Sequence, residues 1–151
     1  MKVYADTSVF GGVFDEEFSE PSKEFFNEVR SEKFSLVTSA IVQLEIRSAP
    51  LDVQDFFESI ARKAIVVEIT KQVLELRNAY IQAQVVTSKS IDDATHVALA
   101  TISECRMIVS WNFKHIVHFQ KIPKYNAVNI LKGYHPIEIF SPAQVIDYDD
   151  S

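Results

Sequence analysis

The sequence predicts an α/β fold in which a mostly parallel sheet carries helices on both faces. Two observations carry this prediction. Short runs of β-branched and apolar residues alternate with longer segments of helical periodicity, and only three glycines interrupt the alternation. Strands that alternate with helices are typical of parallel sheets covered on both faces. No linker, repeat or low-complexity segment divides the chain, so one domain is expected over residues 1–146, followed by an acidic tail at 147–151.

The strand candidates are short apolar runs bounded by polar residues. They are expected at residues 3–5, 34–38, 64–67, 107–110, 127–130 and 137–140. The run at 64–67 reads as a short buried strand between two helices. The runs at 127–130 and 137–140 read as late, short strands.

The helix candidates place apolar residues three or four positions apart. They are expected at residues 21–33, 51–63, 71–86 and 91–104. In the first of them, Phe25, Phe26 and Val29 share a face. Ser39 is a favoured N-cap residue and predicts a helix after the second strand. Ser141 and Pro142 predict a final helical turn with proline at an early position.

Composition excludes several classes of protein. A chain of 151 residues with 47% hydrophobic and 24% charged residues is typical of an ordinary globular domain. The single cysteine, Cys105, excludes an internal disulfide and a cysteine-based zinc site, and it suits a reducing compartment. The opening residues lack the pattern of a signal peptide, and no apolar stretch approaches the roughly 20 residues that span a bilayer. We therefore expect a cytoplasmic protein.

The charge distribution indicates an anionic partner although the net charge is −6. The segment from Cys105 to Ile137 contains five of the 15 basic residues and none of the 21 acidic ones. A face with this imbalance suits a polyanion such as RNA, and Lys114, Lys121 and Lys124 are the candidate phosphate contacts. The alternative is a chance basic stretch on a solvated surface.

Four polar residues are expected to meet at one edge of the sheet. Asp6 follows the first strand, Glu45 lies on the helix after the second, Asp93 begins the helix at 91–104, and Asn112 follows the strand at 107–110. The carboxyl ends of parallel strands form the crevice where ligands bind. Oxygen ligands without cysteine or clustered histidine favour Mg²⁺ or Mn²⁺, ions that suit phosphodiester hydrolysis.

At these residues the sequence resembles the PIN-domain ribonucleases, in particular the compact VapC-like toxins of toxin-antitoxin pairs. The match is to Asp6-Thr7-Ser8, Gln43-Leu44-Glu45-Ile46, Asp93-Ala94-Thr95-His96-Val97-Ala98-Leu99-Ala100 and Ser110-Trp111-Asn112-Phe113. Each motif alone is weakly specific, but all four occur in the family's order across most of the chain. The resemblance implies a three-layer PIN-like domain.

The resemblance also implies an activity, a cofactor and partners. It implies a Mg²⁺- or Mn²⁺-dependent endoribonuclease whose catalytic residues are Asp6, Glu45, Asp93 and Asn112, with Asp6 and Asp93 binding the metal. It further implies the toxin of a type II toxin-antitoxin pair, a homodimer silenced by a small antitoxin protein. Asn112 departs from the pattern, because many members carry a fourth aspartate there.

Structural interpretations of the same residues stay open. Asp6 is also a favoured helix N-cap, and Glu45 could pair with nearby Arg47 on a solvated face. A histidine surrounded by alanine and valine, as His96 is, is more often a half-buried, hydrogen-bonded residue than a ligand. Trp111 and its neighbour Phe113 are more often packing residues than base-stacking surfaces.

Other functional classes fit less well. A receiver domain needs a lysine at a late strand end, a haloacid-dehalogenase-like phosphatase needs Asp-x-Asp, and a dinucleotide-binding domain needs a glycine-rich loop. Gly11, Gly12 and Gly133 cannot build such a loop. The strongest rival is a catalytically inactive PIN fold that binds RNA or protein.

Overall fold

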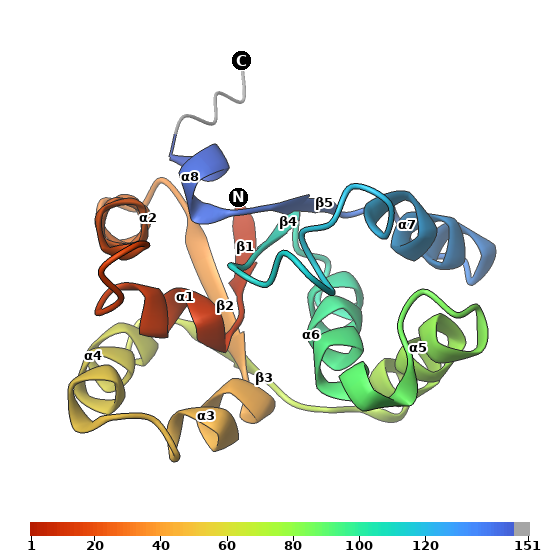
Figure 1. Cartoon of the computed structure of the whole chain (residues 1–151), viewed down its shortest axis with the longest axis horizontal. Coiled ribbons are helices and arrows are strands. Elements are labelled where there is room, and N and C mark those ends of the chain that lie inside the picture. The colour runs from red at the N-terminus through yellow and green to blue at the C-terminus, as the bar shows by residue number, and fades with distance from the viewer. Residues whose placement is uncertain (147–151) are drawn as a thin grey trace.

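A single five-stranded sheet runs through residues 1–146, the part of the chain described by the computed structural model. Its strand order is β3-β2-β1-β4-β5, and every neighbouring pair of strands is parallel. Helices α1 to α4 lie on one side of the sheet and α5 to α7 on the other, as Figure 1 shows. The predicted three-layer α/β architecture is confirmed. The predicted acidic tail at 147–151 lies outside the described residues.

The elements follow one another in the alternation expected from the sequence. The strands are β1 (Lys2–Ala5), β2 (Ser35–Ser39), β3 (Ile65–Val67), β4 (Met107–Val109) and β5 (Glu138–Phe140). The helices are α1 (Thr7–Gly12), α2 (Ser19–Arg30), α3 (Ala40–Ile46), α4 (Leu51–Ala61), α5 (Lys71–Gln82), α6 (Ile91–Ile102), α7 (Ile122–Leu131) and α8 (Pro142–Val145), with a short 3₁₀ turn at Ser88–Ser90 before α6.

The two central strands form the core of the sheet. Val3, Tyr4 and Ala5 of β1 are fully buried, as are all three residues of β4. Helices cover both faces at this point, so side chains that point either way from the strand meet protein rather than water. This explains why these strands read as continuous apolar runs instead of alternating ones.

Strand β3 lies at an edge of the sheet and is not the buried strand that the sequence predicted. Ile65 and Val66 are 44% and 37% exposed. Within residues 1–146 the strand pairs only with β2, and no described strand lies along its other edge. An apolar run cannot distinguish a central strand from an edge strand, because strand order is set by long-range packing.

The prediction of a strand at residues 127–130 is wrong, because these residues belong to α7. Proline at the first turn of α7 favours a helix start, and this signal outweighs the β-branched residues that follow. Tyr125, Val128 and Asn129 are buried, at the three- and four-residue spacing of a helix face. The Tyr80 hydroxyl of α5 donates to Asn129 Oδ1, which ties the two helices together.

Helix α1 was anticipated only by the interpretation of Asp6 as a helix N-cap, and its start is encoded locally. Asp6 caps it by accepting a hydrogen bond from the Ser8 backbone. Near its end, a Cβ atom at Gly12 would lie 2.6 Å from both Ser22 Oγ and Trp111 Nε1. Glycine is therefore required where α1, α2 and the segment after β4 approach one another.

Helices α2, α5 and α6 end earlier than their apolar periodicity predicts. Each is followed closely by a residue with left-handed backbone. Glu32, Gln84 and Glu104 have φ angles of 66°, 57° and 60°. A left-handed residue just after the last turn stops a helix and lets backbone N–H groups return to its final carbonyls. Conversely, the predicted cap at Ser39 is confirmed, since its hydroxyl accepts a hydrogen bond from the Val42 backbone at 3.3 Å.

The predicted final helical turn with proline at an early position is confirmed as α8, and Ser141 and Gln144 also form a capping box at its start. Within residues 1–146, no helix combines the length and apolar character needed to cross a membrane.

Candidate active site

Asp6 is buried at the carboxyl end of β1, where it caps α1. The Ser8 backbone N–H and hydroxyl donate to its Oδ1 at 3.1 and 2.5 Å. The Ser110 hydroxyl, after β4, donates to Oδ2 at 2.6 Å. Burial raises the pKa of Asp6, although the charge of His96 and these hydrogen bonds act in the opposite direction. The capping role is confirmed, and it leaves the carboxylate at the carboxyl edge of the sheet.

Asp93 and Asn112 lie next to each other although they come from different elements. Asp93 is half-buried in the first turn of α6, whereas Asp92 beside it is exposed. Burial raises the pKa of Asp93, opposed first by the charge of His115 and then by a hydrogen bond with the Asn112 side chain. Asn112 Oδ1 already accepts from the His115 backbone at 2.9 Å, so its amide nitrogen is the group that donates to Asp93.

Glu45, on α3, is held through one carboxylate oxygen. Its Oε1 accepts a hydrogen bond from the Thr7 hydroxyl at 3.0 Å and pairs with His96 Nε2 at 2.7 Å. Burial raises the pKa of Glu45, but the hydrogen bond and charge of His96 bring it below its ordinary value. The alternative pairing with Arg47 is not observed among the described residues. His96 is hydrogen-bonded, as expected, and is more deeply buried than expected at 3% exposure.

The three acidic residues interact electrostatically around His96. The charge of Glu45 raises the pKa of both Asp6 and Asp93, and the charge of His96 lowers both. Hydrogen bonds connect the same residues: Thr7, next to Asp6, donates to Glu45, and the Ser110 hydroxyl contacts both Asp6 and the Asn112 backbone. The structure therefore brings Asp6, Glu45, Asp93 and Asn112 to one edge of the sheet.

The carboxylate oxygens at this edge are ligands of the kind that a hard cation with few protein ligands prefers. Within residues 1–146, no three His, Cys, Asp or Glu side chains form a group that could hold a metal ion. Asp6 and Asp93 offer carboxylate oxygens, and burial has raised the pKa of each, so a nearby cation would stabilise their charged forms. Mg²⁺ binds through one or two carboxylates and completes its shell with waters and substrate phosphates.

The three lysines predicted to contact RNA differ in availability. Lys114 and Lys124 are exposed. Lys121 is half-buried, and its Nζ donates to the Val85 carbonyl at 2.9 Å, which ties the segment before α7 to the segment after α5. The fold already uses the ammonium group of Lys121 as a structural hydrogen-bond donor.

The two aromatic residues after β4 also differ. Trp111 stacks on Phe18 with ring centroids 4.1 Å apart, and its Nε1 donates to Ser22 Oγ at 2.8 Å. Trp111 is thus a packing residue, as expected. Phe113, by contrast, is 49% exposed, and Phe119 in the same segment is 80% exposed.

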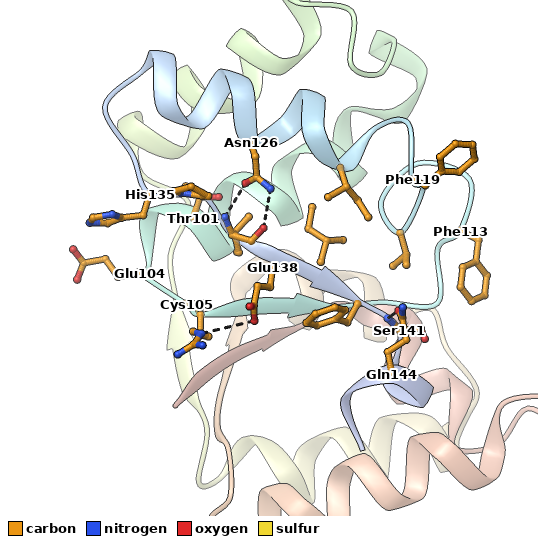
Figure 2. Close-up of a pocket in the computed structure, with 17 residues that line it drawn as sticks. Thr101, Glu104, Cys105, Phe113, Phe119, Asn126, His135, Glu138, Ser141 and Gln144 are labelled. Atoms are coloured by element: carbon orange, nitrogen blue, oxygen red, sulfur yellow. Dashed lines mark hydrogen bonds and ion pairs between the residues drawn. The ribbon is translucent and has the colours of Figure 1, made fainter. Parts of the chain in front are cut away.

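A groove of about 1100 Å³ runs along β5 and α7, and none of the four predicted site residues lines it. Figure 2 shows Phe113 and Phe119 at one end of this groove and Glu104 and His135 at the other. The groove and the acidic site are therefore lined by different residues, although helix α6 and the segment that follows β4 contribute to both.

Several residues of the site were not singled out from the sequence. Ser110 bridges the site, since its hydroxyl contacts Asp6 and accepts a hydrogen bond from the Asn112 backbone at 2.9 Å. His115 contributes the main charge that favours ionised Asp93. Ser110 opens the motif that contains the predicted Asn112, and His115 follows Asn112 by three residues, so the motif and proximity in the chain were the available signals.

The fold defines a class of α/β proteins with a five-stranded parallel sheet and an acidic carboxyl edge. No protein-family model matches the chain, and no curated protein matches it by sequence. Among solved structures, it is similar to VapBC2 from Rickettsia felis, in a complex with a DNA fragment from the promoter. The TM-score is 0.60 at 12% identity, over 93% of this chain and 98% of the other. At this identity the similarity shows the fold, which agrees with the PIN-like architecture expected from the motifs.

Proposed function

We propose that this protein is a metal-dependent endoribonuclease that hydrolyses phosphodiester bonds in RNA. The observation that carries the proposal is the convergence of Asp6, Glu45 and Asp93 at the carboxyl edge of a parallel sheet. Burial and the charge of Glu45 both raise the pKa values of Asp6 and Asp93, which is costly for stability, and groups with such perturbed pKa values cluster at functional sites. The fold similarity to VapBC2 supports the same conclusion.

The side chains have separable roles in this proposal. Asp6 and Asp93 would hold Mg²⁺ or Mn²⁺, which when bound supplies positive charge to the phosphate and acidifies a water. Glu45 has a lowered pKa, so it stays ionised and orients the attacking water instead of retaining its proton. The water oxygen bonds to phosphorus and loses a proton to solvent, one P–O ester bond breaks, and the leaving oxygen takes up a proton from solvent to become a hydroxyl group. Asn112 orients Asp93 through its amide.

We further propose that the protein is the toxin of a type II toxin-antitoxin pair and that it forms a homodimer. VapBC2 is the structural relative that supports an antitoxin partner. A short neighbouring gene that encodes a DNA-binding protein would favour this assignment. Co-expression with that gene product should yield a stable complex, and failure to form one would remove the antitoxin from the proposal.

The second candidate function is a catalytically inactive PIN fold that binds RNA or protein. It is favoured by the amide at Asn112 and by the finding that no three metal-binding side chains group together in residues 1–146. An RNA-cleavage assay with Mn²⁺ and with EDTA separates the two functions. Cleavage that requires Mn²⁺ supports the nuclease, whereas RNA binding without cleavage supports the inactive module.

Removing the two exposed lysines should weaken RNA binding and its dependence on salt. For single-stranded RNA each lost phosphate contact lowers the slope of log affinity against log salt by about 0.7, so Lys114→Gln with Lys124→Gln should lower it by about 1.4. The measurement is a fluorescence-anisotropy titration in EDTA at several salt concentrations. Lys71→Gln on α5 is the control, since that side chain is 91% exposed and outside the basic segment. Equal slopes for all proteins would place RNA on another face.

Asn112→Asp should lower the Mn²⁺ concentration needed for half-maximal activity. The substitution adds a negative charge beside Asp93, and the affinity of a hard cation rises with the number of charged ligands. The new carboxylate can still accept the hydrogen bond from the His115 backbone, but it no longer donates to Asp93. The metal-free variant should therefore also melt below the wild type.

Metal titrations of cleavage, with melting curves in EDTA, check both effects of Asn112→Asp. Mn²⁺ should support the wild type better than Mg²⁺, because it tolerates mixed ligation and binds such sites more tightly. If the variant requires as much Mn²⁺ as the wild type, residue 112 lies outside the reaction centre.

A further inference from the structure

A continuous chain of buried hydrogen bonds ends on the carboxylate of Glu45. The hydroxyls of Ser39 and Tyr4 lie 2.8 Å apart, and the Tyr4 hydroxyl lies 2.7 Å from His96 Nδ1. His96 Nε2 lies 2.7 Å from Glu45 Oε1. The four side chains come from β2, β1, α6 and α3, so this chain of bonds links four elements at the carboxyl edge of the sheet.

The direction of these hydrogen bonds follows from the acceptor at the end. An ionised carboxylate only accepts, so His96 Nε2 carries a hydrogen and donates to Glu45. When the imidazole is neutral, Nδ1 accepts from the Tyr4 hydroxyl, and the Tyr4 oxygen accepts from Ser39. When the imidazole is charged, Nδ1 donates to Tyr4, whose hydroxyl then donates to Ser39. The bond to Glu45 is the same in both states, because only the two hydroxyl hydrogens rotate.

This arrangement leaves one oxygen of Glu45 available. Both of its hydrogen bonds go to Oε1, from Thr7 and from His96. Within residues 1–146 no hydrogen bond to Oε2 is found, and the side chain is 34% exposed. A carboxylate fixed through one oxygen presents the other in a defined direction, which is what an oriented water requires.

We propose that His96 is a positioning residue, which with Tyr4 fixes Glu45 so that its free oxygen accepts a hydrogen bond from the attacking water. This inference rests on the proposed nuclease function. His96 does not touch the substrate and acts only through Glu45. A partner that orients a functional side chain typically contributes 10- to 100-fold to activity, and we expect a loss of about this size without it.

Two substitutions of different length separate positioning from simple packing. Glutamine can place its amide nitrogen near the position of Nε2 and so still donate to Glu45, whereas the amide of asparagine is too short to reach. His96→Asn should lower kcat for an RNA oligonucleotide by about 10- to 100-fold with KM unchanged, and His96→Gln should retain most of kcat. Equal kcat losses in the two variants, at matched melting temperature, would overturn the proposal.

Tyr4→Phe tests the next link, with a matched control elsewhere in the core. Both Tyr4 and Tyr80 are fully buried and hydrogen-bonded, but Tyr80 bonds to Asn129 between α5 and α7, away from Glu45. Both Tyr→Phe variants should lose similar stability. Only Tyr4→Phe should lower kcat; an equal effect of Tyr80→Phe on kcat would show that core stability, not positioning, is measured.

The contact itself can be tested without activity. NMR of the imidazole nitrogens in the metal-free protein should show a protonated Nε2 on His96, with a signal that shifts in Glu45→Gln. An unprotonated Nε2, or a signal unaffected by Glu45→Gln, would overturn the inference. If the wild type does not cleave RNA, the proposed function fails, while the NMR result still decides whether His96 holds Glu45.

Discussion

Asp93→Asn and Asp6→Asn should each reduce RNA cleavage by at least about a hundredfold while leaving the fold intact. Each substitution replaces a carboxylate by an amide of nearly the same shape and removes one of the two charges proposed to hold the metal. Asparagine caps helices as well as aspartate does, so α1 should survive in the Asp6 variant. The measurements are cleavage rates at saturating Mn²⁺ and far-ultraviolet circular dichroism.

The neighbouring residue provides a matched control for the Asp93 variant. Asp92 lies in the same first turn of α6 and carries the same negative charge near the positive end of the helix dipole. Unlike Asp93, it is exposed. Asp92→Asn should therefore cleave RNA at the rate of the wild type. Cleavage that persists in both Asp6→Asn and Asp93→Asn, and also in EDTA, would refute a metal-dependent reaction at this site.

Mn²⁺ should raise the melting temperature of the wild type and have little effect on Asp93→Asn. A ligand that binds only the folded state at about 100 times its Kd stabilises that state by about 2.7 kcal/mol. In a chain of this length that corresponds to about 5–10 °C. Calorimetry with and without Mn²⁺ measures the shift, and an equal gain in Asp93→Asn would exclude Asp93 as a ligand.

The pH dependence of the same shift identifies the group involved. The pKa of Asp93 is raised in the folded state, so its ionisation costs stability at neutral pH, and this cost disappears as the pH falls through the raised value. Protonated Asp93 cannot bind the ion, so the Mn²⁺-induced shift should decrease over the same range. At neutral pH the metal-free Asp93→Asn protein should lack this cost. A shift that is independent of pH would contradict the assignment.

Local signals predicted much of the fold because they act over a few residues. The caps at Asp6 and Ser39, the apolar central strands and the alternation of strands with helices all follow from neighbouring positions. These features placed an acidic residue after the first strand and another at the start of a later helix. They also predicted a parallel sheet, since strands separated by helices are joined by crossovers.

Local sequence patterns gave a wrong prediction at two places, one where strand and helix preferences compete and one where the position of a strand in the sheet was needed. The run at 127–130 has β-branched residues but follows a proline that begins a helix, and burial of Tyr125, Val128 and Asn129 on one face favours α7. The run at 64–67 was assigned correctly as a strand, but its place at the edge depends on which strands pair with β2. No local pattern contains that information.

The sequence by itself determined which chemistry the chain can carry: four oxygen-bearing residues in a defined order, one buried cysteine and a basic segment free of acids. Tertiary structure alone decided which of those groups meet. The strand order places the ends of β2, β1 and β4 side by side, so that Ser110 reaches Asp6 and His96 reaches Glu45 across 51 positions of the chain. Such contacts depend on packing between distant segments, and in this way His96, expected only to be half-buried and hydrogen-bonded, contacts the carboxylate of Glu45.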